Sequence, residues 1–94
     1  MPRPRLRRYI GYRHNNYHFK PQGIPLRLLK EISLSVDELE SLRLKHIKDL
    51  DQEESAKIMK ISRSTYQRIL YSAYRKVTRA LVNGYAIKID KKME

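Results

Sequence analysis

The sequence contains no cysteine, so disulfide bonds, thiolate zinc sites and cysteine nucleophiles are excluded. Its three glycines, Gly11, Gly23 and Gly84, are too few and too scattered to form a loop that binds nucleotide phosphates. No apolar run approaches the roughly 20 residues that a membrane-spanning helix requires. Neither G-x-S-x-G nor H-E-x-x-H occurs, and no paired acids stand outside a helix N-terminus. We therefore expect a small soluble cytoplasmic domain that contacts no membrane, uses no cofactor and is not an enzyme.

Acidic residues are missing from one long stretch of the chain, whose formal net charge is +11. Residues 55–89 contain eight Lys or Arg and no acid, and residues 1–34 contain eight Lys or Arg and a single acid, Glu31. Residues 37–54 reverse the balance, with seven acids and three basic residues. Such segregation creates a directed field that attracts a polyanion and speeds encounter with it. Charge alone leaves open the alternative of a generic solvated basic surface.

Three helices are predicted, and the first begins at Ser35. Ser35 and Glu38 have the spacing of a capping box, in which each side chain bonds the backbone N–H of the other residue. Acids in this first turn also complement the positive end of a helix. An apolar stripe keeps helical spacing until about Lys48, and it consists of Val36, Leu39, Leu42 and either Leu44 or Ile47.

The other two helices are predicted from their caps and their apolar spacing. Asp51 is an N-cap candidate with Glu54 three residues later, and the second helix should run to about Met59. The third should begin after Ser62 and end at Gly84, because glycine favours a left-handed cap. It is longer than a groove contact needs, so its second half should pack against a core or a partner. We interpret the acids of these helices as capping and solvated residues: Asp37, Glu38, Glu40, Asp51, Glu53 and Glu54.

Residues 52–70, QEESAKIMKISRSTYQRIL, have the pattern of two short helices joined by a tight turn. This is the helix-turn-helix pattern, which places its second helix in a DNA groove. Ala56 is the small residue expected where the helices cross, and Ile61 is an apolar anchor in the turn. The core between the helices should be closed by Met59, Tyr66 and Ile69. An ordinary amphipathic hairpin would share this spacing, but it would not require polar donors on the outer face of the second helix.

The outward positions of the third helix carry donors and acceptors suited to duplex DNA. Side chains there can reach base edges, while hydroxyls and cations near the turn can bind phosphates. The residues predicted to read base edges are Arg63, Ser64, Gln67 and Arg68. Those predicted to contact phosphates are Lys60, Ser62, Thr65 and Arg75, together with Gln52 at a helix N-terminus.

The N-terminal segment PRPRLRR forms a proline-stiffened arm that carries Arg3, Arg5, Arg7 and Arg8. Such an arm can enter the minor groove, where the negative potential of narrow A·T tracts attracts arginine. The sequence favours this interpretation no more than its alternative, a disordered basic tail that makes only nonspecific phosphate contacts. His14 and His18 stand four residues apart, but the asparagines between them favour a turn and no carboxylate or cysteine completes a metal shell. We expect polar or phosphate contacts there and no metal site.

Residues 85–89 alternate in polarity, which predicts one short half-buried strand. A lone strand cannot satisfy its backbone, so it needs a mate in residues 8–12, in residues 17–19 or in another subunit. The long third helix also leaves apolar material beyond the motif, namely Tyr71, Tyr74 and Val77. We therefore expect a homodimer, because two-fold pairing doubles the contacts on a symmetric DNA site.

Four segments together resemble the family called "domain of unknown function 134": FKPQGIPL (19–26), LSVDELESLRL (34–44), QEESAKIM (52–59) and ISRSTYQRIL (61–70). The resemblance covers nearly the whole chain and implies a small prokaryotic DNA-binding protein whose core is similar to region 4 of sigma factors. The family's usual glycine in the inter-helix turn is Lys60 here, and its common alanine is Ser55. A non-glycine residue in a left-handed turn costs about 1 kcal/mol. The chain has no region to melt promoter DNA or to grip a polymerase core, so we do not expect a sigma factor.

We predict a mainly α-helical protein with a sigma-region-4-like helix-turn-helix, an extended basic N-terminal arm and a short C-terminal β-strand. Its parts are the arm and a Pro/Gly loop (1–34), the three-helix domain (35–84), and the strand and tail (85–94). The expected function is sequence-specific binding of double-stranded DNA by a nucleoid-associated transcriptional regulator, with no small-molecule effector evident. Two other classes stay open: an RNA- or ribosome-associated basic protein, favoured by the tyrosines near arginine in residues 8–19, and an adaptor for an acidic protein.

Overall fold

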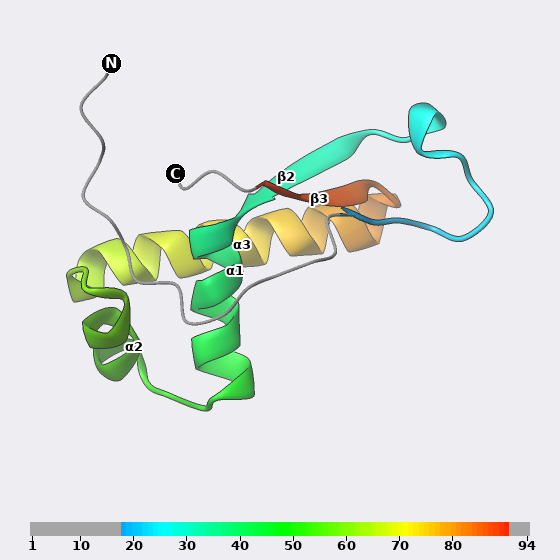
Figure 1. Ribbon diagram of the computed structural model, residues 1–94. Helices are drawn as coiled ribbons and strands as arrows, with labels where there is room; N and C mark the ends of the chain where they lie inside the picture. Colours follow the sequence, from blue (N-terminus) through cyan, green and yellow to red (C-terminus); the bar gives the residue numbers. More distant parts are fainter. Residues whose placement is uncertain (1–17, 91–94) are drawn as a thin grey trace, which may run out of the picture.

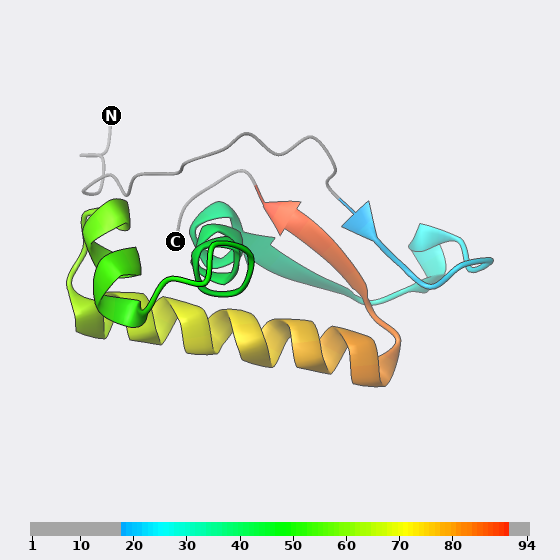
Figure 2. The same ribbon diagram turned by 90° about the horizontal axis from the view of Figure 1, so that it is seen from below.

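The computed structural model describes residues 18–90, which are mainly helical and include one small three-stranded sheet (Figure 1). The longest element, α3, runs along the molecule, with α2 at its N-terminal end and the sheet along its C-terminal half (Figure 2). The elements in chain order are β1 (His18–Phe19), η1 (Leu26–Leu28), β2 (Glu31–Ser35), α1 (Val36–Leu42), η2 (Arg43–Ile47), α2 (Gln52–Met59), α3 (Arg63–Asn83) and β3 (Ala86–Asp90). No helix within the described range is both long enough and apolar enough to cross a membrane.

The helix boundaries follow the capping residues predicted from the sequence. Ser35 and Glu38 form the capping box of α1, with the Glu38 N–H donating to the Ser35 hydroxyl at 3.3 Å and the Ser35 N–H to the Glu38 carboxylate at 2.9 Å. Asp51 caps α2 in the same way. Ser62 caps α3, which ends at Gly84 in the left-handed conformation (φ 70°). These predictions are confirmed. They could be made from the sequence because each cap uses groups that are close together along the chain.

A turn of π-helix, η2, continues α1 and decides which apolar residue faces the core. Its hydrogen bonds span five residues, as between the Lys48 N–H and the Arg43 carbonyl at 3.0 Å. The wider turn shifts the following side chains around the helix axis. Leu44 is therefore buried, whereas Ile47 is 74% exposed. Of the two alternatives left open by the sequence, Leu44 is the core residue.

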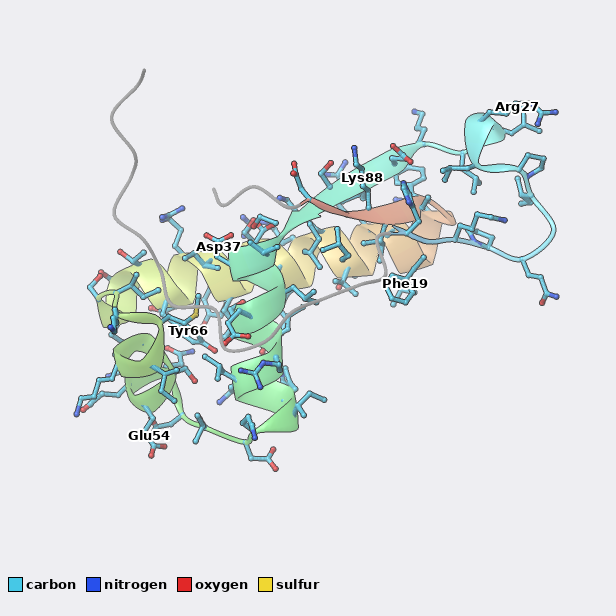
Figure 3. All side chains as sticks on the ribbon, in the orientation of Figure 1. Phe19, Arg27, Asp37, Glu54, Tyr66 and Lys88 are labelled. Atoms are coloured by element: carbon cyan, nitrogen blue, oxygen red, sulfur yellow. The ribbon has the colours of Figure 1, made fainter. Side chains whose placement is uncertain are left out.

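The first part of the core lies where α1, α2 and α3 meet, and Tyr66 is its largest side chain (Figure 3). The Tyr66 hydroxyl donates to the Ser41 carbonyl oxygen at 2.7 Å, which satisfies its only donor inside the core. Burial raises the pKa of Tyr66 above its usual value near 10.0. The buried members of this cluster are Leu44, Ala56, Met59, Tyr66 and Leu70, with Ile61 and Tyr74 packed against them. The predicted core positions Ala56, Met59, Ile61, Tyr66 and Ile69 are thereby confirmed, since Ile69 is also fully buried.

The second part of the core lies between the sheet and the C-terminal half of α3 (Figure 2). Ala73 of α3 is packed with Leu34 of β2 and Ile89 of β3. Val77 is partly buried against the same cluster, so part of this predicted partner surface is used inside the protomer. The unusual length of α3 is explained by this contact, as the sequence analysis anticipated for its second half.

The sheet has the order β1-β3-β2, so the C-terminal strand is central. β3 pairs antiparallel with β1, in the register Phe19↔Ile87, and parallel with β2, in the register Ile32↔Ile87. The predicted mate in residues 17–19 is thus confirmed for His18 and Phe19, whereas residues 8–12 lie outside the described range. Pairing of this strand with another subunit is wrong, because β3 has a neighbour in its own chain on both sides. Strand β2 was not anticipated.

Three acids of α1 correct the interpretation of the helical acids as solvated. Asp37, Glu38 and Glu40 are fully buried, whereas Asp51, Glu53 and Glu54 are exposed. Burial of a carboxylate is costly unless hydrogen bonds and cations compensate it. Glu38 accepts from the Ser72 hydroxyl at 2.5 Å and the Lys76 ammonium at 2.8 Å, and Glu40 accepts two bonds from Arg43 at 2.7 and 2.9 Å. Glu38 therefore joins α1 to α3, whereas Glu40 is paired within the same helical segment.

Candidate nucleic-acid interface

A tight turn connects α2 to α3 and sets the direction in which α3 leaves. Lys60 occupies the left-handed region, with φ 59° and ψ 44°, as expected from the position of the family's glycine. The Ile61 N–H donates to the Ala56 carbonyl at 3.0 Å, and the Ile61 side chain packs against the core. The turn is therefore anchored at its backbone and by its apolar residue, which holds the N-terminal half of α3 in one orientation.

The predicted base-reading residues lie on the outward side of α3 near its N-terminus. Arg63, Ser64 and Arg68 are exposed and Gln67 is half-buried. Ser64, Gln67 and Arg68 are spaced by three and four residues, so they share one face of the helix. The opposite face is fixed, because Tyr66, Ile69 and Leu70 are fully buried. The structure thus brings these residues together on one rigid, accessible surface.

Two of the predicted phosphate contacts already serve the helix cap. The Ser62 hydroxyl accepts from the Thr65 N–H at 3.1 Å and donates to the Thr65 hydroxyl at 2.8 Å. Lys60 and Arg75 are exposed, the first in the turn and the second three turns along the outward face of α3. The cations therefore bracket the predicted base readers, while the two hydroxyls hold the helix end in shape.

Gln52 is the weakest of the predicted phosphate contacts on electrostatic grounds. It opens α2, whose backbone N–H groups would favour an anion, but its neighbours Asp51, Glu53 and Glu54 are exposed carboxylates. Figure 3 shows Glu54 on the side of α2 that faces away from α3. Three negative charges at this helix end oppose a phosphate there.

The charge segregation seen in the sequence has a spatial counterpart. The acids of α1 are buried, and two of them are paired with Arg43 and Lys76. The exposed acids of residues 37–54 lie between the end of η2 and the first turn of α2. The exposed side of α3 carries no acid and presents Arg63, Arg68, Arg75 and Arg79.

The basic arm is not part of the described range. Arg3, Arg5, Arg7, Arg8 and His14 all lie outside residues 18–90. His18 is in β1, where its Nε2 lies 3.2 Å from a Glu31 carboxylate oxygen. Within the described range no group of three or more His, Asp or Glu side chains is arranged to hold a metal ion.

Residues 1–92 match the family described as "Protein of unknown function DUF134". The chain belongs to this family. Relatives named UPF0251 protein are 50% identical over 90 residues in Thermoanaerobacter pseudethanolicus and in Caldanaerobacter subterraneus subsp. tengcongensis, with 96% of this chain and 76% of each relative aligned. A UPF0251 protein of Halothermothrix orenii is 44% identical, with 96% of this chain and 67% of the relative aligned. No solved structure matches.

In this DUF134 member the structure adds a residue that the sequence analysis treated only as partner surface. Tyr71 is 45% exposed and lies one turn beyond Gln67, on the same face of α3. Gln67 Nε2 donates to the Tyr71 hydroxyl at 3.1 Å. Helical spacing of four residues was a signal for this contact, but the apolar character of tyrosine suggested packing instead.

Proposed function

We propose that this protein binds double-stranded DNA sequence-specifically as a transcriptional regulator, with α2 and α3 acting as a helix-turn-helix similar to that of sigma region 4. α3 enters the major groove with its N-terminal half, and α2 lies across the backbone. A helix with its side chains is about 10–12 Å wide, and the major groove of B-DNA is about 12 Å wide. The size and exposure of α3 suit this placement.

The single observation that carries the proposal is the contrast between the two faces of the N-terminal half of α3. One face is fully buried in the core with α1 and α2. The other presents Ser64, Gln67 and Arg68, whose groups can pair with base edges, within a surface free of acids. A hairpin that served only packing would not need donors and acceptors at these positions.

The basic side chains around this face supply affinity that does not depend on sequence. Lys60 in the turn and Arg75 further along α3 are exposed, and we expect them to contact phosphates on either side of the groove. The exposed acids stand near the start of α2, away from this surface. The resulting field favours one orientation of the protein on a polyanion.

We also include a homodimer in the proposal, because one helix-turn-helix reads only a few base pairs. The support is apolar surface at the far end of α3, where Leu81 and Val82 are 75% and 78% exposed and Phe19 is 51% exposed. Leu81 lies 17 residues beyond Ser64, roughly 26 Å along the helix. Contact between two copies at this end leaves the base readers uncovered. Light scattering of the wild-type protein and of Leu81→Lys tests the dimer, and we expect a dimer for the wild type and a monomer for the variant. A wild-type protein that is monomeric at tens of micromolar and binds a single asymmetric half-site contradicts the dimer.

Competition binding tests the proposed function itself. Equal lengths of duplex DNA, structured RNA and single-stranded DNA compete for the full-length protein across a salt series. We expect duplex DNA to bind most tightly, with an affinity that falls steeply as salt rises. A preference for structured RNA, or for single strands, overturns the proposal in favour of the RNA-associated class. Failure to bind any nucleic acid leaves the adaptor class.

A further inference from the structure

A continuous chain of side-chain contacts leads from η2 to the predicted base reader Gln67. The Tyr74 hydroxyl oxygen lies 2.6 Å from His46 Nε2, and the two rings are 5.6 Å apart. Tyr74 stacks on Tyr71, with ring centroids 6.2 Å apart and planes 28° from parallel. The Tyr71 hydroxyl then accepts from Gln67 Nε2 at 3.1 Å. The last two contacts are between residues of α3, whereas His46 belongs to η2 and connects this series of contacts to a second element.

These contacts restrict Tyr71 although it is nearly half exposed. Stacking on Tyr74 holds its ring, and Tyr74 is in turn packed against the core of Leu44, Ala56, Met59, Tyr66 and Leu70. A tyrosine side chain has only two rotatable angles, so a ring held from one side keeps its hydroxyl in a narrow range of positions. Tyr71 therefore offers Gln67 a hydroxyl of restricted position at the rim of the surface proposed to face the groove.

The hydrogen bond uses only part of the hydrogen-bonding capacity of Gln67. Its amide has two N–H donors and a carbonyl oxygen. A bidentate contact to adenine requires the carbonyl oxygen and one N–H, which meet N6 and N7 of the base. The remaining N–H can donate to Tyr71 at the same time. The contact with Tyr71 is thus compatible with base reading and restricts the positions that the Gln67 side chain can take.

Building on the proposed function, we infer that Tyr71 is a positioning residue that pre-orients the Gln67 amide for adenine. A side chain that moves freely in the unbound protein loses conformational freedom when it binds a base, which weakens the contact. By restricting the Gln67 side chain before binding, Tyr71 strengthens its contact with the preferred base and increases selectivity at that base pair without touching the base. Its hydroxyl adds specificity, while its ring adds packing.

The test uses the best duplex that the wild-type protein selects from a random pool, together with all single base-pair changes of it. Binding is compared for wild type, Tyr71→Phe, Gln67→Ala and the double variant. Tyr71→Phe removes only the hydroxyl and keeps the stacked ring. Tyr85→Phe, which removes a phenol hydroxyl near the opposite end of α3, is the matched control. Thermal unfolding of each variant shows whether the fold is retained.

We expect Tyr71→Phe to reduce discrimination at the base pair that Gln67→Ala also affects, by about 2- to 10-fold, the range for one hydrogen bond. Binding to an unrelated duplex should be unchanged, the Tyr85 control should match wild type, and Tyr71→Phe should add nothing in the Gln67→Ala background. Unchanged discrimination, equal weakening of every duplex, or additive effects overturn the inference while the proposed function stands. If wild type selects no sequence at all, the proposed function and this inference fail together.

Discussion

Lys76 Nζ lies 2.8 Å from a carboxylate oxygen of Glu38, and this ion pair joins the middle of α3 to the first turn of α1. Glu38 is fully buried, and the Lys76 side chain is about one third exposed. The same carboxylate forms the capping box with Ser35 and accepts from Ser72. One acid therefore caps its own helix and fixes the crossing of α1 over the helix proposed to read DNA.

The first prediction removes the cation from this pair. Lys76→Met keeps most of the aliphatic chain but leaves a buried carboxylate with one partner fewer, so the free energy of unfolding should fall by about 1–3 kcal/mol. The matched control is Lys57→Met on the exposed side of α2, which should change stability by less than about 0.5 kcal/mol. Urea denaturation measures both. Equal stabilities of the wild type and Lys76→Met would show that the buried Glu38 carboxylate does not need the Lys76 ammonium.

The second prediction concerns alkaline pH. Because burial raises the pKa of Tyr66, its neutral form is favoured in the folded state relative to the unfolded chain. The resulting stability is fully present below pH 10, the pKa region of unfolded tyrosine, and is lost as pH rises above it towards the folded pKa. Tyr66→Phe has no such group, although it loses the bond to Ser41. The stability difference between wild type and Tyr66→Phe should therefore shrink between pH 8 and pH 11. A constant difference across that range contradicts the assignment.

The third prediction tests the left-handed residue in the inter-helix turn. Lys60→Gly and Lys60→Ala both remove the charge, but only glycine is unstrained at φ 59°. The glycine variant should be more stable than the alanine variant by about 1 kcal/mol. Both should bind DNA less tightly than wild type if Lys60 contacts phosphate. Should the two variants unfold at the same denaturant concentration, the strain at this turn is negligible.

The fourth prediction concerns the arm. Deletion of residues 1–8 removes four arginines, so duplex affinity should fall and the dependence of log affinity on log salt should flatten by roughly 0.9 per lost phosphate contact. The thermal unfolding of residues 18–90 should be retained. A truncated protein with an unchanged salt slope would show that the arm does not touch DNA.

The features that the sequence predicted correctly depend on neighbouring residues. Ser35, Asp51 and Ser62 cap their helices through groups three residues away, and Gly84 ends α3 through its own backbone. The left-handed conformation of Lys60 was implied by the family resemblance, because the family usually has glycine at this position. Such signals can be read along the chain, because both partners lie within one helical turn.

The features that were missed depend on partners far away in the sequence. Glu38 reaches Ser72 and Lys76, which are 34 and 38 residues later, so nothing beside it signals burial. Strand β2 pairs in parallel with β3, which lies more than fifty residues later in the chain. The strand is short and directly follows a loop that contains two prolines, so its alternation of polar and apolar residues was not recognised. The shared face of the predicted base readers could be anticipated because helical spacing alone places them there. The contact of Tyr71 with Tyr74 could not, since it depends on the stacked geometry of the two rings.

The central claim is that α3 reads base pairs, and the most direct measurement compares two arginines on its exposed face. Duplexes selected by the wild-type protein and their single base-pair variants are bound by Arg68→Ala and by Arg75→Ala. We predict that Arg68→Ala loses discrimination at particular base pairs, by about 1–3 kcal/mol for a bidentate contact, whereas Arg75→Ala weakens all sequences alike. If Arg68→Ala weakens every duplex equally, α3 contacts phosphates only and the account of sequence reading is contradicted.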